Sequence, residues 1–245
     1  MNRIQLWPTD LWETPAAPAV ASPAYSSEAA YAELFTPHDY EPNYEYPLLV
    51  WLHGPGGDRR EMLQVMPHLS LRNYVAVGPQ GFDHDDEGAG CYWPTQTDSA
   101  EDIEHATARI LEAVAWARHR RKIHPQRIFI AGLQEGGVMA LRVALQAPEH
   151  FAGAISLGGP FPLGEANLSQ WSQVRQLPLF LAQGREDHNY PAEQVRDELQ
   201  LFHAASMKVH VRRYPGGDEL TTQMLLDMNA WMMEQINQPQ AAKCG

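Results

Sequence analysis

The segment from Arg127 to Ala140 contains the residues best suited to position a reactive side chain. An apolar run leads into Gly132, Gln134 and Gly136, and residues with helical spacing follow. In a G-x-S-x-G pattern, small residues permit a sharp turn from strand to helix, and the central serine is exposed as a nucleophile. The central residue of this chain is Gln134. Its amide nitrogen is delocalised into the carbonyl, so the turn is predicted but a serine-type nucleophile is missing.

A second glycine-rich turn follows the apolar run at 48–52, where His53 precedes Gly54, Gly56 and Gly57. Glycines at the carboxyl end of a strand leave backbone N–H groups free to face an anion, which would form half of an oxyanion hole. A plain tight turn before the next helix is the alternative interpretation. The predicted elbow further along the chain favours the oxyanion loop.

The elements that position these turns follow from the hydrophobic periodicity. Continuous apolar runs bounded by Gly or Pro are typical of strands buried on both faces, whereas apolar residues spaced by three and four indicate amphipathic helices. Strands are expected at 30–35, 48–52, 74–77, directly before the elbow, and at 152–157, 177–181 and 208–213, and helices at 59–70, 98–119, from the elbow to 147, and at 192–205 and 220–236. This alternation predicts an α/β fold with a mostly parallel, twisted sheet covered by helices on both faces.

From Tyr46 to Ile236 the chain resembles the phospholipase/carboxylesterase branch of the α/β-hydrolases, which includes acyl-protein thioesterase-like esterases. The resemblance is carried by the segments 48–58, 127–140 and 151–159. It implies the α/β-hydrolase fold. The family carries Ser and usually Gln where this chain has Gln134 and Glu135, so the resemblance implies the fold more directly than the activity.

The resemblance also implies where a catalytic triad would lie, because the family orders its residues as Ser, Asp or Glu, and His. Asp187, three residues after Gly184, matches the acid, and Asp218 stands where the family carries His after two glycines. The degenerate triad positions are therefore Gln134, Asp187 and Asp218. We expect the two carboxylates to converge with one of them protonated, and the Gln134 amide to bridge them.

The resemblance extends to further site residues. It places Glu135 with the glycine turn in an oxyanion-hole-like group, and it places Tyr92 and Trp93 at the border of the acyl pocket, with core packing of Trp93 as the alternative. His188 follows the acid directly and can turn towards the pocket. A histidine without a nucleophile would still leave serine-type acyl transfer unsupported.

Composition excludes several classes of partner. The net charge of 18 − 30 = −12 opposes binding to nucleic acid or to anionic lipid. No apolar run approaches the roughly 20 residues that span a bilayer, and the N-terminus lacks a signal-peptide pattern, so we expect a cytoplasmic chain without a membrane span. No cofactor, metal site or disulfide between Cys91 and Cys244 is expected. The acidic loop at 82–88 lacks the spacing of a calcium-binding loop, which favours a solvated loop.

The chain is expected to divide into an irregular N-terminal extension at 1–24, a single α/β-hydrolase-like domain at 25–238 and a flexible tail at 239–245. Trp7 and Trp12 of the extension are expected to dock on the body of the chain, and a second subunit or a protein partner is the alternative. Two functions stay open for the chain as a whole. One is a catalytically inactive relative of the carboxylesterases that binds a small molecule or assembles as a homo-oligomer. The other is an active ester or thioester hydrolase that uses a non-standard constellation around Asp187 and Asp218, with or without the help of a metal ion.

Overall fold

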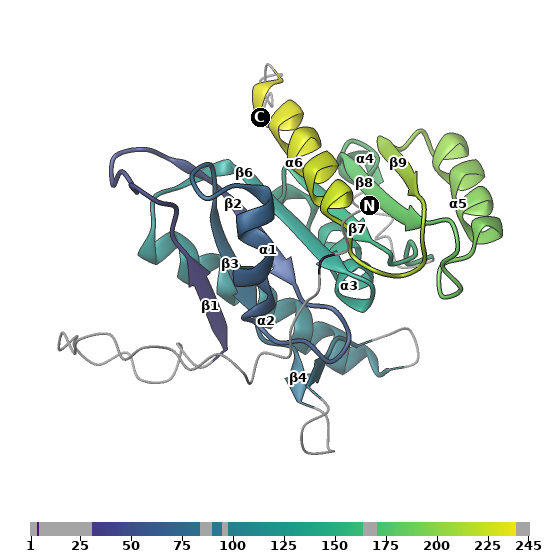
Figure 1. Cartoon of the computed structure of the whole chain (residues 1–245), viewed down its shortest axis with the longest axis horizontal. Helices are drawn as coiled ribbons and strands as arrows, with labels where there is room; N and C mark the ends of the chain where they lie inside the picture. Colours follow the sequence, from purple (N-terminus) through teal and green to yellow (C-terminus); the bar gives the residue numbers. More distant parts are fainter. Residues whose placement is uncertain (1–3, 5–30, 84–89, 95–97, 164–170, 239–245) are drawn as a thin grey trace.

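The computed structural model describes residue 4 and residues 31–83, 90–94, 98–163 and 171–238. Its main sheet has seven strands in the order β1-β3-β2-β6-β7-β8-β9 (Figure 1). The strands are β1 (Ala32–Phe35), β2 (Tyr46–Leu52), β3 (Val75–Pro79), β6 (Ile123–Leu133), β7 (Gly153–Leu157), β8 (Leu179–Gly184) and β9 (Val209–Tyr214). Strand β1 pairs antiparallel with β3, and every other pair in this sheet is parallel. A separate two-stranded sheet joins β4 (Phe82–Asp83) to β5 (Cys91–Tyr92).

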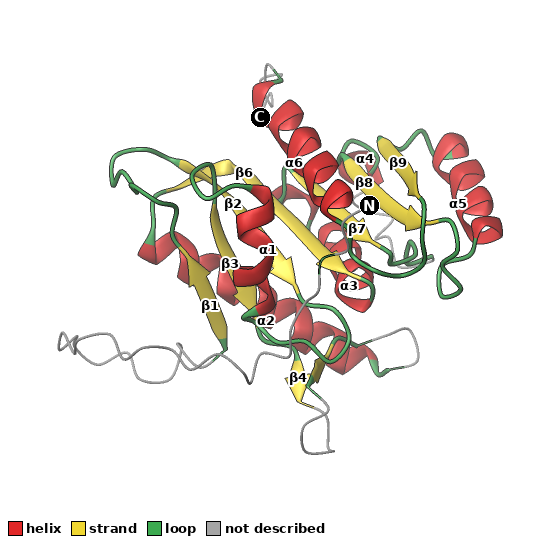
Figure 2. Ribbon diagram, viewed as in Figure 1, coloured by secondary structure: helices red, strands yellow, loops and turns green. Residues whose placement is uncertain are grey.

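Helices cover both faces of the main sheet (Figure 2). They are α1 (Glu61–Leu69), α2 (Ala100–Arg120), α3 (Glu135–Gln146), the 3-10 helix η2 (Pro148–His150), α4 (Trp171–Val174), α5 (Ala192–Ala204) and α6 (Thr222–Asn237). Met62 of α1 and Trp231 of α6 belong to the apolar cluster on one face. Ile110 of α2 and Leu141 of α3 belong to the cluster on the other face. The predicted α/β class, with a mostly parallel sheet between two helical layers, is confirmed.

The central strands explain why the sequence contains continuous apolar runs. Every residue of β2, β7 and β8 is buried, because each of these strands lies between two layers of helices. The expected elements are present in the expected order, with ends that differ by a few residues, and the structure adds η2, α4 and the small β4–β5 sheet. Strand β8, for example, continues through Gln183 and Gly184. Both residues are buried, although Gln183 is polar and Gly184 has no side chain. Hydrophobic periodicity does not register such residues.

Several expectations concern segments outside the described residues. These are the N-terminal extension apart from Ile4, the loop at 84–88, and the tail at 239–245. Ile4 donates its backbone N–H to the Leu220 carbonyl at 3.2 Å, and its side chain packs against the cluster that contains α1 and α6. The docking of Trp7 and Trp12 and the division into extension, domain and tail stay predictions.

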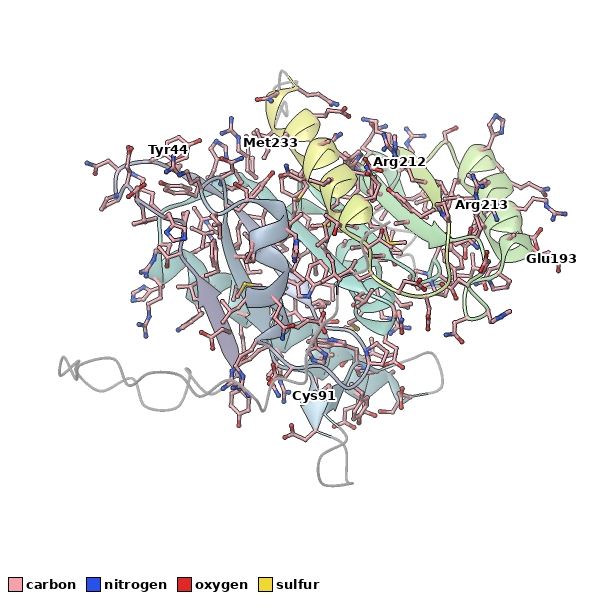
Figure 3. The ribbon with its side chains drawn as sticks, in the orientation of Figure 1. Tyr44, Cys91, Glu193, Arg212, Arg213 and Met233 are labelled. Atoms are coloured by element: carbon pink, nitrogen blue, oxygen red, sulfur yellow. The ribbon has the colours of Figure 1, made fainter. Side chains whose placement is uncertain are left out.

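Two compositional expectations touch the described part of the chain. Cys91 is buried with a free thiol in the small β4–β5 sheet (Figure 3), while Cys244 lies outside the described residues. Among the helices that the structure describes, none is long and apolar enough to cross a bilayer.

Candidate functional site

The predicted elbow is a sharp turn between β6 and α3. Its central residue, Gln134, has φ 50° and ψ −112°, a left-handed conformation that side chains rarely adopt. The turn requires close backbone contact, because a Cβ added to Gly132 would lie 2.3 Å from the Gly136 carbonyl. A Cβ on Gly136 would lie 2.5 Å from the Leu52 carbonyl. The glycines therefore hold the elbow geometry although no serine occupies its centre.

Gln134 connects the elbow to the turn that follows β9. Its backbone N–H donates to Leu157 at 2.8 Å, and its side-chain amide donates to the main-chain carbonyl of Asp218 at 3.0 Å. The Asp218 side chain is exposed. The expectation that Gln134 bridges two carboxylates is therefore wrong in one respect: the amide reaches the backbone of Asp218 and not its carboxylate.

Asp187 is buried, with 4% of its surface exposed, and only one of its two carboxylate oxygens has a partner. Oδ1 accepts the backbone N–H groups of Asn189 at 2.8 Å and Tyr190 at 3.0 Å. Oδ2 is buried and has no hydrogen-bond partner among the residues that the structure describes. In a Ser-His-Asp triad, the carboxylate accepts a hydrogen bond from the imidazole. Asp187 thus keeps an acceptor for which the structure provides no donor.

The three expected triad positions, Gln134, Asp187 and Asp218, lie at one edge of the sheet. A Cβ added to Gly158 would lie 3.6 Å from Gln134 Cγ and 3.8 Å from Asp187 Oδ2, so these two side chains flank the same glycine. The Asp218 turn is held beside the Asp187 loop because Glu186 donates its N–H to Gly216 at 2.8 Å. The fold brings the three positions together, but Gln134 and the two carboxylates do not form a single hydrogen-bonded set.

The glycine turn after β2 differs from the sequence-based expectation of free N–H groups. Gly54 donates to both carboxylate oxygens of Glu61 at 3.2 Å, Gly56 donates to the Cys91 carbonyl at 3.1 Å, and Gly57 donates to the Gly54 carbonyl at 3.0 Å. The remaining residue of this turn is Pro55, which has no N–H. Residues 54–57 consequently have no backbone donor left for an anion, because the glycine N–H groups donate to the loop itself, to α1 and to β5.

Glu61 is the buried acid that organises this loop, and sequence reasoning missed it. Its Oε1 also accepts the Trp51 indole N–H at 2.9 Å. Burial raises the pKa of Glu61 from 4.5 to about 7, against the opposing effect of the hydrogen bonds from Trp51 and Gly54. The sequence signal for a buried acid is weak. Glu61 lies in helical register with the apolar residues Val65 and Leu69 of α1, but acids in the first turn of a helix are far more often exposed to solvent.

His53 is part of the framework of the same loop. Its ring is 1% exposed, and Nε2 accepts the Gly81 N–H at 3.1 Å, so the proton lies on Nδ1, which is 2.9 Å from the Gly54 carbonyl. Burial lowers the pKa of His53 and keeps the ring neutral. Both ring nitrogens are therefore engaged by backbone groups and do not face a ligand.

A cavity of about 560 Å³ lies beside the elbow. Its lining residues are mostly apolar, and the polar ones are amides and one carboxylate: Pro55, Pro94, Gln134, Glu135, Val138, Gly158, Pro160, Phe161, Pro162, Leu163, Asn189 and Gln194. The expected pocket residues Tyr92, Trp93 and His188 are not among them. Trp93 is in the core and donates to the His53 carbonyl at 3.1 Å, Tyr92 pairs with Phe82 in the small sheet, and His188 is exposed. Their neighbours Pro94 and Asn189 line the cavity instead.

A second buried acid, Glu198 of α5, holds one wall of the cavity. It accepts the backbone N–H of Phe161 at 3.1 Å, the side-chain amide of Gln194 at 3.2 Å, and the hydroxyl of Tyr190. Burial raises its pKa. The signal was present in the sequence, because Glu198 falls in helical register with the buried residues Val195 and Phe202.

The chemical capacity of the site follows from these contacts. Ser156, the serine nearest the elbow in the sheet, is fully buried and donates to the Gly159 carbonyl at 2.6 Å, which leaves it unable to attack a substrate. Within the described ranges, no three His, Cys, Asp or Glu side chains form a group that could hold a metal ion. What remains is an apolar cavity, several amides and an unpaired carboxylate oxygen.

Comparison with known proteins agrees with this architecture. The family model described as phospholipase/carboxylesterase matches residues 43–236. The carboxylesterase SOBER1 of Arabidopsis thaliana is 24% identical over 115 residues, and acyl-protein thioesterase 1 of Gibberella zeae is 26% identical over 118 residues. Each match covers 46% of this chain and 50% of the relative's length.

A solved structure extends the likeness over most of the fold. The crystal structure of Zea mays acyl-protein thioesterase 2 superposes with a TM-score of 0.67 at 17% identity, covering 84% of this chain and 99% of the other. At this identity the likeness concerns the fold. The family model spans most of the chain, from the glycine turn through the elbow to α6, so the chain belongs to the phospholipase/carboxylesterase family of α/β-hydrolases.

Proposed function

We propose that this protein no longer performs the serine-type acyl transfer of its family and uses the cavity beside the elbow to bind a small molecule. The observation that carries the proposal is the unpaired Oδ2 of Asp187 next to Gln134. An acid without an imidazole to orient, beside an elbow without a hydroxyl, supports neither formation nor hydrolysis of an acyl-enzyme.

The glycine turn adds independent support. Stabilisation of a tetrahedral intermediate needs donors aimed at the developing oxyanion, and this is usually a large part of the rate enhancement. The N–H groups of Gly54, Gly56 and Gly57 have internal acceptors, and Pro55 has no N–H. Three parts of the reaction machinery are thus altered, in three separate segments, while the sheet and elbow are retained.

Two measurements test this proposal. We expect p-nitrophenyl esters from acetate to palmitate, and a palmitoyl thioester, to be hydrolysed no faster with the full chain than in buffer. A fluorophosphonate probe, which labels activated serines, is expected to leave the protein unmodified. The assays are repeated with EDTA and with Mg²⁺ or Zn²⁺, because a metal-assisted site around Asp187 and Asp218 would be active only with the cation.

The Asp187→Ala variant decides how any turnover is interpreted. Hydrolysis by the wild type that disappears in this variant would overturn the proposal and favour the alternative of an active hydrolase. Hydrolysis that is equal in both proteins would indicate a contaminating esterase. The exposed carboxylate of Asp197 on α5 makes Asp197→Asn the matched control, because it removes a charge without touching Asp187 or Asp218.

A further inference from the structure

The electrostatic character of the cavity distinguishes between classes of ligand. None of its described lining residues is Lys, Arg or His, and Glu135 is acidic. The segments 95–97 and 164–170, which follow the lining residues Pro94 and Leu163 in the sequence, contain no basic residue either. The whole chain carries a net charge of −12. A carboxylate or phosphate head group would therefore enter without a counter-charge and against the field of the protein.

The buried oxygen of Asp187 supplies the opposite preference. Leaving a buried acceptor unsatisfied costs free energy, and the cost is larger when the group is charged. Oδ2 has no partner and lies 3.8 Å from the Cβ position of Gly158, a residue of the cavity wall. A ligand that brings an N–H donor to this point removes that cost and adds a charge-assisted hydrogen bond.

Gln134 lines the cavity beside this oxygen. Its Cγ lies 3.6 Å from the same Gly158 position, and its amide is held by the hydrogen bond to the Asp218 carbonyl. A hydrogen bond to a charged group contributes more to stability than a hydrogen bond between neutral groups. A cationic donor that pairs with Asp187 is thus able to displace the Gln134 side chain.

We propose that the cavity binds a primary alkylammonium compound, with its apolar chain against the proline-rich wall and its ammonium group paired with Asp187 Oδ2. This inference rests on the proposed function as a binding protein and specifies its ligand class. The apolar part of the site is formed by Val138 and by Pro160, Phe161 and Leu163. A volume of about 560 Å³ is in the range of ordinary small-molecule sites.

Three probes with the same chain and different heads test the inference. Hexylamine, hexanol and hexanoate are titrated into the full-length protein at neutral pH and followed by calorimetry or by chemical-shift changes. We expect the amine to bind at least ~10-fold more tightly than hexanoate, with the alcohol between them, since a tenfold ratio requires only about 1.4 kcal/mol. Equal affinities, or tighter binding of hexanoate, would overturn the inference.

Four variants locate the interaction. Asp187→Asn is expected to lower the amine affinity to that of the alcohol, whereas Asp218→Asn, which alters an exposed carboxylate, is expected to keep the preference. Val138→Trp fills the cavity and is expected to abolish binding of all three probes. Gln134→Ala removes the lining side chain beside Asp187 and is expected to tighten amine binding several-fold. This last variant keeps the inference testable if Asp187→Asn does not fold.

The binding and catalytic results are separable. Amine binding that survives Val138→Trp would show that the amine does not occupy the cavity. Amine binding that weakens in Gln134→Ala would show that the ammonium does not lie at Asp187. Either result would overturn the inference and leave the proposed function unaffected. Ester hydrolysis by the wild type would overturn the proposed function, whichever probe binds best.

Discussion

The elbow and the glycine turn after β2 differ in the part of each segment that departs from a serine-hydrolase pattern. At the elbow, the backbone is kept: Gln134 has a strained left-handed φ, and Gly132 and Gly136 make contacts that a side chain would block. Only the central side chain differs from a nucleophile elbow. In the glycine turn, the backbone itself has no free donor, because Pro55 has no N–H and the glycine N–H groups donate to acceptors within the protein.

The difference reflects what each segment does for the fold. The elbow glycines allow α3 to start directly against the ends of β2 and β6, so the packing of the sheet depends on them. The donors of the glycine turn have no such role, and they are free to stabilise their own loop through Glu61. The side chain at position 134 is therefore easier to replace than the backbone donors of the glycine turn. This difference gives an experimental way to test the two segments separately.

The largest effect is expected from restoring both segments together. Gln134→Ser with Asp218→His supplies a hydroxyl and an imidazole, and Asp187 Oδ2 is available as the acceptor for the imidazole. We expect this double variant to hydrolyse p-nitrophenyl acetate slowly. Adding Pro55→Ala supplies an N–H in the loop and is expected to raise kcat by about 10²–10³-fold, the effect of one oxyanion donor.

The matched control is Pro94→Ala in the same double variant. It removes a proline ring from the same cavity wall without adding a donor to the glycine turn, so kcat should stay unchanged. Equal rates for the double variant and the variant with Pro55→Ala would show that backbone donors are not what the loop lacks, and the contrast between elbow and loop would fail.

The next effect concerns Glu61, which accepts the Gly54 N–H of the glycine turn. Below pH 4.5 the carboxyl is protonated in both folded and unfolded chains. Between pH 4.5 and about 7 the unfolded chain ionises while the buried carboxyl stays protonated, so the free energy of unfolding falls as the pH rises. The expected loss is about 3 kcal/mol, at a linkage of roughly 1.4 kcal/mol per pH unit.

Urea denaturation at several pH values across this window measures the effect. Other acids contribute as well, Glu198 among them, whose pKa is raised by burial in the same direction. The decisive quantity is therefore the difference between the wild type and Glu61→Gln, which cannot ionise. Stability curves that run parallel for the two proteins would contradict a raised pKa at Glu61.

The sequence predicted the parts of this molecule that depend on residue type and spacing over many positions. The apolar runs of β2, β7 and β8 predicted buried strands because both faces of these strands are covered. The glycines around Gln134 predicted the elbow because no other residue fits those backbone contacts.

The misplaced residues lie in loops, where spacing carries less information. Trp93 and His188 were expected at the pocket, and their neighbours Pro94 and Asn189 line it, because a shift of one residue in a loop exchanges the side chain that faces inward. The partner of Gln134 was missed for a related reason. Residue types suggested the Asp218 carboxylate, whereas the amide reaches the Asp218 carbonyl, and every residue has such a carbonyl.

The smallest effect tests the elbow backbone by itself. In most positions Gly is less stabilising than Ala, because Gly has more conformational freedom to lose on folding. At Gln134, with φ 50°, the order should reverse: both substitutions remove the amide bond to Asp218, but only Gly relieves the strain. We expect Gln134→Gly to be about 1 kcal/mol more stable than Gln134→Ala in urea denaturation, at the low end of the strain stored in such residues. Val138 provides the control, because it lies inside α3. At this position Val138→Ala should be more stable than Val138→Gly. If Ala is also more stable at Gln134, the elbow is not strained, and its retained geometry no longer distinguishes it from the glycine turn.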